Sequence, residues 1–176
     1  MKRVVCTLDS LNLRKSKRLP IDNLNQETIY IDGFNLIITI EVALSKGILI
    51  VGSDGNVRDL AGLRGTYKII DKTIKALELI GRCLDHNKCK KTVFYLDSPV
   101  SNSGSLKVQI LEVAKSWNTE VEVNLVNNAD VILEKLNNVV SSDAVIIDKC
   151  GSYFNLGKEI IEKYIDETNI IDLNKV

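Results

Sequence analysis

The stretch from Ile29 to Ile38 constrains the fold of this chain more than any other. It is an apolar, β-branched run broken by polar residues or glycine at Asp32, Gly33 and Asn35. A central strand of a parallel sheet has helices on both faces, so its sequence is a nearly continuous apolar run. A carboxylate inside such a run is costly unless it lies at the strand end and faces a cleft. We therefore predict a central parallel strand that ends at a ligand-binding edge.

Two later segments repeat this arrangement. The apolar residues 93–96 run into Asp97, and residues 145–147 run into Asp148. In open α/β sheets, ligands bind outside the carboxyl ends of the strands. A single Asp after a strand commonly caps the next helix or turn, but three of them from parallel strands indicate a shared site for Asp32, Asp97 and Asp148.

The rest of the chain alternates between strand and helix patterns, which is typical of a parallel sheet with right-handed crossovers. Helices are expected over residues 39–45, 67–85, 106–117, 127–136 and 153–164, and strands over residues 29–38, 91–97, 120–126, 144–148 and 169–173. Residues 47–66 form a glycine-rich insertion, with a hairpin turn at Asp54-Gly55. The predicted fold class is α/β, a three-layer α/β/α sandwich with a mainly parallel central sheet.

The N-terminal residues differ from the rest of the chain. The 176 residues suit one domain with a substantial core. Residues 1–26 contain a basic cluster at 14–18, and Pro20 follows it. We predict a solvated basic connector, or the tail of a helical region, before a domain over residues 27–176. An arm that touches phosphates is the alternative.

Composition excludes several classes of protein. The 23 basic and 23 acidic residues give a net charge of zero, so nucleic acid would have to bind at a local patch. No apolar run is long enough to span a bilayer, and basic residues come too early for a signal peptide. Four cysteines without a CxxC pair, together with His86 alone, do not make a usual zinc set. We expect free thiols, a cytoplasmic protein without a membrane partner, and His86 at a polar helix end.

Clustered carboxylates have a direct chemical consequence. Like charges held close together repel and raise each other's pKa unless a cation lies between them. Hard divalent cations prefer carboxylate oxygens, so we expect Mg²⁺ or Mn²⁺. Such a site suits phosphoryl chemistry, in which the metal activates water and polarises the phosphate. Asp130 is a candidate fourth catalytic acid, although the helix dipole would favour a carboxylate in that first turn anyway.

Candidate substrate-binding residues lie on two loops. Arg58 and Arg64 are on the glycine-rich insertion, where they are either solvated or in contact with substrate. Ser101, Asn102 and Ser103 precede a predicted helix. They are good N-cap residues, and a helix N-terminus is also a phosphate site, so both roles stay open.

The acidic pattern resembles that of PIN-like domains over about residues 27–172. The matching features are Asp-Gly-Phe-Asn from Asp32, Asp97, Asp130 and Ser-Asp-Ala-Val-Ile-Ile-Asp at 142–148. PIN-like enzymes are Mg²⁺- or Mn²⁺-dependent nucleases that act chiefly on RNA and have the sheet order 3-2-1-4-5. The resemblance implies metal ligation by Asp32, Asp97 and Asp148, support from Asp130, and contact of Asn35 with the first carboxylate or the phosphate.

A closer likeness is to an uncharacterised, mostly archaeal PIN-like family. Its matching stretches are Ile31–Leu36, Asp54–Tyr67, Leu96–Leu106 and Ser141–Asp148. Members of that family carry a helical region before this domain, and no activity is established for them.

The leading functional hypothesis is a metal-dependent endoribonuclease that hydrolyses phosphodiesters, with RNA as the partner. A haloacid-dehalogenase-like phosphatase would need a second Asp where Phe34 stands. A non-catalytic module that binds RNA, a nucleotide or a protein is the other alternative. A homodimer and a protein partner both stay open.

Overall fold

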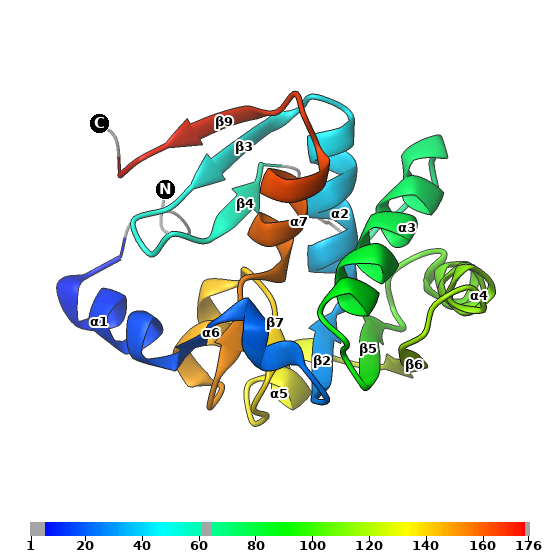
Figure 1. Ribbon diagram of the computed structural model, residues 1–176, viewed down its shortest axis with the longest axis horizontal. Helices are drawn as coiled ribbons and strands as arrows, with labels where there is room; N and C mark the ends of the chain where they lie inside the picture. Colours follow the sequence, from blue (N-terminus) through cyan, green and yellow to red (C-terminus); the bar gives the residue numbers. More distant parts are fainter. Residues whose placement is uncertain (1–5, 61–64, 175–176) are drawn as a thin grey trace.

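A six-stranded parallel sheet forms the centre of the molecule (Figure 1). The computed structural model describes residues 6–60 and 65–174. Its strands, in sheet order, are β1 (Arg18–Leu19), β8 (Tyr153–Phe154), β7 (Val139–Val140), β2 (Thr28–Asp32), β5 (Lys91–Asp97) and β6 (Glu120–Val126). Each neighbouring pair runs parallel, so the carboxyl ends of β2 and β5 meet at one edge.

Helices cover both faces of this sheet, which confirms the predicted three-layer α/β/α class. One face carries α2 (Gly33–Leu44), α3 (Asp71–His86), α4 (Ser103–Ala114) and α7 (Leu156–Tyr164). The other carries α5 (Ala129–Leu133) and α6 (Ala144–Lys149), and α1 (Leu8–Lys17) packs against α6. A short 3-10 helix, η1 (Ile21–Leu24), links β1 to β2.

Both faces of the central strands are buried, as the apolar run predicts. Ile31 and Phe94 are fully buried in the core beneath α2 and α3. Side chains alternate along a strand, so Tyr30 and Tyr95 face the second core beneath α5 and α6, where their rings stack with centroids 6.5 Å apart.

A second, smaller sheet contains the predicted hairpin. The strands β3 (Ile48–Val51) and β4 (Val57–Asp59) are antiparallel, and Gly55 in their turn has a φ of +76°. The strand β9 (Asn169–Asp172) pairs with β3 and is therefore outside the central sheet. Leu49, Val51 and Val57 pack this sheet against α2 and α7.

The first predicted strand is too long. β2 ends at Asp32, and α2 begins immediately because the Asp32 carboxylate accepts a hydrogen bond from the Asn35 amide as an N-cap. A Cβ on Gly33 would lie 2.5 Å from a Leu96 methyl group, so glycine lets α2 start close against β5. The apolar residues after Asp32 are therefore a buried helix.

The strand predicted over residues 144–148 is also wrong, because this segment is the helix α6. A short apolar run fits a buried strand or a buried helix equally well, and the Asp143 N-cap decides for the helix. The strand at this place in the sheet is β7, and β8 follows it. The sheet thus keeps the implied order 3-2-1-4-5 as β6-β5-β2-β7-β8, with β1 added at the edge.

The N-terminal segment is more ordered than the predicted solvated connector. Residues 8–17 form α1, which Thr7 caps by accepting from the Ser10 amide, and residues 18–19 form the edge strand β1. Arg14 is the buried residue of this helix, with 6% of its surface exposed. The predicted boundary at residue 27 stays a prediction.

Candidate functional site

An acidic pocket of about 180 Å³ lies at the carboxyl edge of the central sheet. Its walls come from the ends of β2 and β5, the start of α2, the strand β4, and the starts of α5 and α6. The residues that line it are Asp32, Phe34, Asn35, Ile38, Arg58, Asp59, Asp97, Asp130, Ser142, Asp143 and Ala144. Five carboxylates therefore share one small space, as predicted for Asp32, Asp97 and Asp130.

Asp32 is the most deeply buried acid of the pocket, with 8% of its surface exposed. Its carboxylate accepts hydrogen bonds from the Ser141 hydroxyl at 2.9 Å and from the Asn35 amide at 3.4 Å. Burial raises the pKa of Asp32 to about 7; the Ser141 bond opposes this shift, and the charges of Asp130 and Asp143 add to it. Removing the charge repulsion would require a proton or a cation.

Asp97 and Asp130 reach the pocket from neighbouring elements. Asp97 ends β5, and its Oδ1 accepts from the backbone amide of Ala129 at 2.7 Å, which fixes the first turn of α5. Asp130 is the next residue of that turn and is exposed. Asp97 therefore holds the start of α5 and lines the pocket at the same time, so a capping role and a site role are compatible.

A turn between β7 and α6 brings the fourth acid. Asp143 caps α6 by accepting from the Val145 amide at 2.8 Å. Asn35 Oδ1 accepts from the Ser142 amide at 2.9 Å and from the Ser142 hydroxyl at 3.1 Å, so Asn35 holds this turn against α2. Ser141 accepts from the Asp143 amide while it donates to Asp32, and therefore links the two carboxylates.

The structure does not bring Asp148 to the pocket. Its two carboxylate oxygens accept from Arg14 Nε at 2.6 Å and Nη2 at 2.9 Å. The reason is that this segment is a helix and not a strand: in a helix that Asp143 caps, residue 148 lies more than one turn away from the pocket edge. The acid that this segment contributes to the pocket is Asp143, and not Asp148 as expected.

Arg58 lines the pocket, but its guanidinium is engaged in other contacts. Nη1 and Nη2 donate to the buried Asp54 at 2.8 and 2.6 Å, and Nε donates to the Ser142 carbonyl at 2.8 Å. The structure thus gives Arg58 a structural role that the sequence did not suggest. Its predicted companion Arg64 lies outside the described residues.

The predicted loop at 101–103 contacts protein backbone, and these residues are not among the pocket lining. Ser101 Oγ accepts from the Tyr67 amide at 3.1 Å, and Asn102 Nδ2 donates to the Tyr67 carbonyl at 2.7 Å. Ser103 Oγ donates to the Ser98 carbonyl at 3.3 Å. These contacts tie the segment before α3 to the start of α4.

The polar residues of the site that were not predicted are Asp59, Ser141, Ser142 and Asp143. Asp143 had a local signal, because an Asp before an apolar run is a helix N-cap pattern. Asp59 ends β4 and accepts from the Thr39 hydroxyl at 2.9 Å. Its place at the pocket depends on how the small sheet packs on α2, which local sequence does not encode.

The pocket offers carboxylate oxygens, which are the ligand type that hard divalent cations prefer. Within residues 6–60 and 65–174, no group of three acidic, histidine or cysteine side chains is arranged to hold a metal ion. Mg²⁺, however, usually keeps several waters and uses one or two carboxylates together with substrate phosphates. Asp32 and Asp97, which end adjacent strands and line the pocket, are the carboxylates that could serve in this way.

Fold and site together define an α/β/α protein with an acidic pocket at the carboxyl edge of its parallel sheet. The family described as "Domain of unknown function (DUF5616)" matches residues 21–159, and the chain belongs to this family. It is similar to an uncharacterized protein of Methanocaldococcus jannaschii, with 42% identity over 138 residues. The match covers 78% of this chain and 65% of that archaeal relative, so the chain spans less than two thirds of the relative's length.

The remaining comparisons add two findings. No solved structure matches the chain. Within the described part of the chain, none of the helices is both long and apolar enough to cross a membrane.

Proposed function

We propose that this protein is a Mg²⁺- or Mn²⁺-dependent nuclease, an endoribonuclease that hydrolyses phosphodiesters at the acidic pocket. The observation that carries the proposal is the convergence of Asp32, Asp97, Asp130 and Asp143 on one pocket of about 180 Å³. A folded protein holds such acids together at a cost, because their charges repel. That cost is typical of functional sites.

The residues of the pocket have different proposed roles. A bound divalent cation supplies charge neutralisation for the phosphate and an activated water. Asp32 and Asp97 are the proposed ligands, because they end adjacent parallel strands. Asp130 and Asp143 line the same pocket and would order water molecules around the ion. Asn35 is proposed as a positioning residue, because it holds the turn that carries Asp143.

Electrostatics favours a cation-dependent mechanism over direct binding of phosphate. Arg58 is the one cationic residue that lines the pocket in the described part of the chain, and Asp54 already neutralises its guanidinium. A phosphate that entered the pocket would therefore meet net negative charge. With a divalent cation in place, the same carboxylates become its ligands.

The test is cleavage of labelled single-stranded and structured RNA in the presence of Mg²⁺ or Mn²⁺. We expect cleavage by the natural sequence, loss of cleavage in Asp97→Asn, and full activity in Asp22→Asn. In Asp97→Asn the new side-chain carbonyl can still accept from the Ala129 N–H, so the fold is retained. Asp22 is an exposed acid outside the pocket lining and controls for the change in charge. Cleavage that survives in Asp97→Asn would contradict the proposal.

A non-catalytic module that binds RNA, a nucleotide or a protein is the second candidate. It is favoured by the lack of a preformed three-ligand group among the described residues. RNA binding that is insensitive to Asp97→Asn and to removal of metal, without cleavage, would support this candidate.

We also propose that the protein works in the cytoplasm. Its four cysteines are free thiols, and three of them (Cys83, Cys89 and Cys150) are buried. Free thiols are typical of proteins in reducing compartments. Detection of the native protein in the soluble cytoplasmic fraction would test this.

A further inference from the structure

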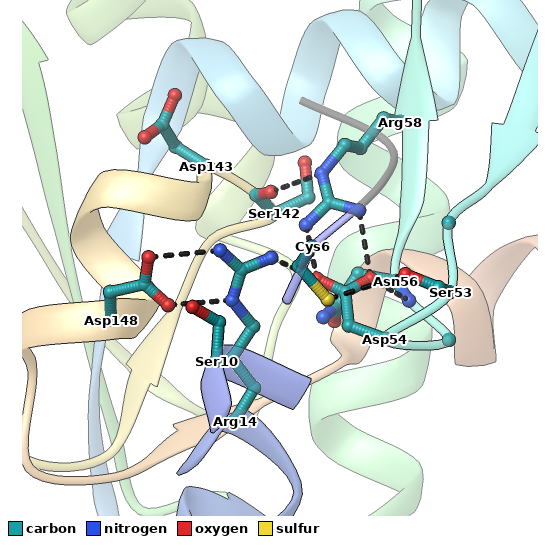
Figure 2. A network of polar contacts seen from close by, with 12 residues as sticks. Cys6, Ser10, Arg14, Ser53, Asp54, Asn56, Arg58, Ser142, Asp143 and Asp148 are labelled. Atoms are coloured by element: carbon teal, nitrogen blue, oxygen red, sulfur yellow. Dashed lines mark hydrogen bonds and ion pairs between the residues drawn. The ribbon is translucent and has the colours of Figure 1, made fainter. Parts of the chain in front are cut away.

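A second cluster of charged side chains lies beside the pocket, and it contains a residue of the N-terminal helix. Figure 2 shows the Arg14 guanidinium of α1 between Asp148 of α6 and Asp54 of the β3–β4 turn. Arg58 lies on the other side of Asp54. We call these four residues (Arg14, Asp54, Arg58 and Asp148) the charge network.

The contacts in the charge network are short and mostly buried. Arg14 Nη1 donates to Asp54 Oδ2 at 2.7 Å, and both side chains are almost completely buried, with exposures of 7% and 1%. Arg14 also forms the two-pronged contact with Asp148. Burial would raise the pKa of Asp54, but hydrogen bonds from Arg58 and Arg14 outweigh it and hold that pKa well below its usual range.

The charge network continues into the acidic pocket through Arg58. Its Nε donates to the Ser142 carbonyl at 2.8 Å, and the amide of Ser142 donates to Asn35. The next residue is Asp143, whose carboxylate in Figure 2 is directed away from the charge network. Two side chains, Asp54 and Arg58, therefore connect Arg14 to the turn that carries a pocket acid.

Two further contacts hold α1 and the residues just before it against the domain. Lys17 Nζ donates to the Asp148 carbonyl at 2.6 Å, and Cys6 Sγ lies 3.3 Å from Ser53 Oγ. All of α1 precedes residue 21, where the family match begins. A segment outside the matched region thus inserts a buried charge beside its pocket.

We propose that Arg14 is a positioning residue for the acidic pocket, acting through Asp54 and Arg58 on the Ser142–Asp143 turn. Asp54 accepts from both guanidinium groups, so the position of each one constrains the other. Without Arg14, Asp54 has a single cationic partner and Asp148 loses its charge-paired contact. Arg58 is then free to shift relative to Asp54, and the Ser142 carbonyl that it holds shifts with it.

The first readout does not require the proposed function. We would record amide chemical shifts of Ser142 and Asp143 in the full chain for Arg14→Lys, Arg14→Ala and Lys15→Ala. Lysine keeps the charge but cannot form the two-pronged contact, so Arg14→Lys is expected to fold and still shift both amides. Lys15 is exposed and neighbours Arg14, so its replacement controls for loss of positive charge on α1.

Chemical rescue with guanidinium tests the positioning role of Arg14 in Arg14→Ala, which is expected to be less stable than the natural sequence. Millimolar guanidinium chloride should return the Ser142 and Asp143 amides of Arg14→Ala toward their original shifts. Sodium chloride at the same ionic strength should not. Lys15→Ala should be unaffected by either salt, because its site contains no vacated guanidinium position.

The second readout rests on the proposed function. Mn²⁺ affinity should fall roughly tenfold in Arg14→Lys, the lower end of the range for residues that support metal ligands, and should be unchanged in Lys15→Ala. If the natural sequence does not bind Mn²⁺, the proposed function fails, whereas the amide shifts still test the role of Arg14. If Arg14→Lys lowers stability but leaves both amides where they were, Arg14 is only structural and this inference is overturned.

Discussion

Two groups of acidic side chains lie on either side of the Ser142–Asp143 turn, and they differ in what balances their charge. In the charge network, Asp54 is in contact with two guanidinium groups and its pKa is lowered. In the pocket, Asp32 is also buried but has other acids near it, and its pKa is raised to about 7. The same residue type is therefore charge-balanced in one place, and in the other it lies among like charges whose repulsion a proton or a cation would relieve.

The largest loss of stability is expected at Asp54, because two guanidinium groups balance its charge. Asp54→Asn leaves the buried Arg14 and Arg58 with a neutral partner, and breaking a buried ion pair on one side costs about 3–5 kcal/mol. Urea unfolding measured by circular dichroism would give the free energy of unfolding. Asp22→Asn should change it by less than about 0.5 kcal/mol. An equally small change in Asp54→Asn would show that its contacts with the two guanidinium groups do not stabilise the fold.

In the pocket, by contrast, removal of a carboxylate charge is expected to increase stability. The pKa of Asp32 is about 7 in the folded protein and near 3.8 without burial. Between about pH 4 and pH 7 the unfolded state has lost this proton while the folded state still holds it, so stability falls as pH rises through that window and levels off above pH 7. We expect Asp32→Asn to stabilise the metal-free protein by roughly 2 kcal/mol at pH 8, about half of the full shift because the pocket is open to water. The gain should vanish near pH 4 in the same unfolding experiment. Destabilisation at pH 8 would contradict the assignment.

A smaller loss is expected for Asp148→Asn. Its carboxylate is 35% exposed, which screens its interaction with Arg14, so the unfolding free energy should fall by about 1 kcal/mol. Any loss of Mn²⁺ affinity, measured by calorimetry, should be far smaller than in Asp97→Asn. Equal losses in both variants would place Asp148 with the pocket acids and contradict its separation from them.

The smallest change in stability is expected for Ser141→Ala. Loss of its hydrogen bond to Asp32 should cost about 0.5 kcal/mol, because water can enter the pocket in its place. The pKa of Asp32 should rise further, since the Ser141 bond lowers it. Carboxyl NMR titration would measure this rise, with Ser116→Ala, in the turn after α4, as the control. An unchanged pKa of Asp32 would show that Ser141 does not act on this carboxylate.

The sequence predicted those parts of the fold that local patterns encode. The apolar runs before Asp32 and Asp97 indicated buried parallel strands, and Asp54-Gly55 indicated a hairpin turn; all of these are present, although the first strand ends at Asp32 and not at residue 38. The strand expected at residues 144–148 was wrong because β-branched runs fit both strands and helices.

The candidate site could be predicted only in part, for a related reason. Asp32, Asp97 and Asp130 each follow or begin an element whose direction is fixed by the parallel sheet. Asp143 was missed because its role depends on where α6 begins. Arg14 contacts Asp148 across 134 residues of sequence, and no local pattern distinguishes it from the exposed basic residues around it.

The decisive experiment is calorimetric titration of Mn²⁺ into the natural sequence, Asp97→Asn, Asp143→Asn and Asp148→Asn. The central claim is that the clustered acids of the pocket bind a hard divalent cation. We expect saturable binding that is lost in Asp97→Asn, weakened in Asp143→Asn and largely kept in Asp148→Asn. No binding to the natural sequence at millimolar Mn²⁺, or equal binding by all four proteins, would contradict the claim.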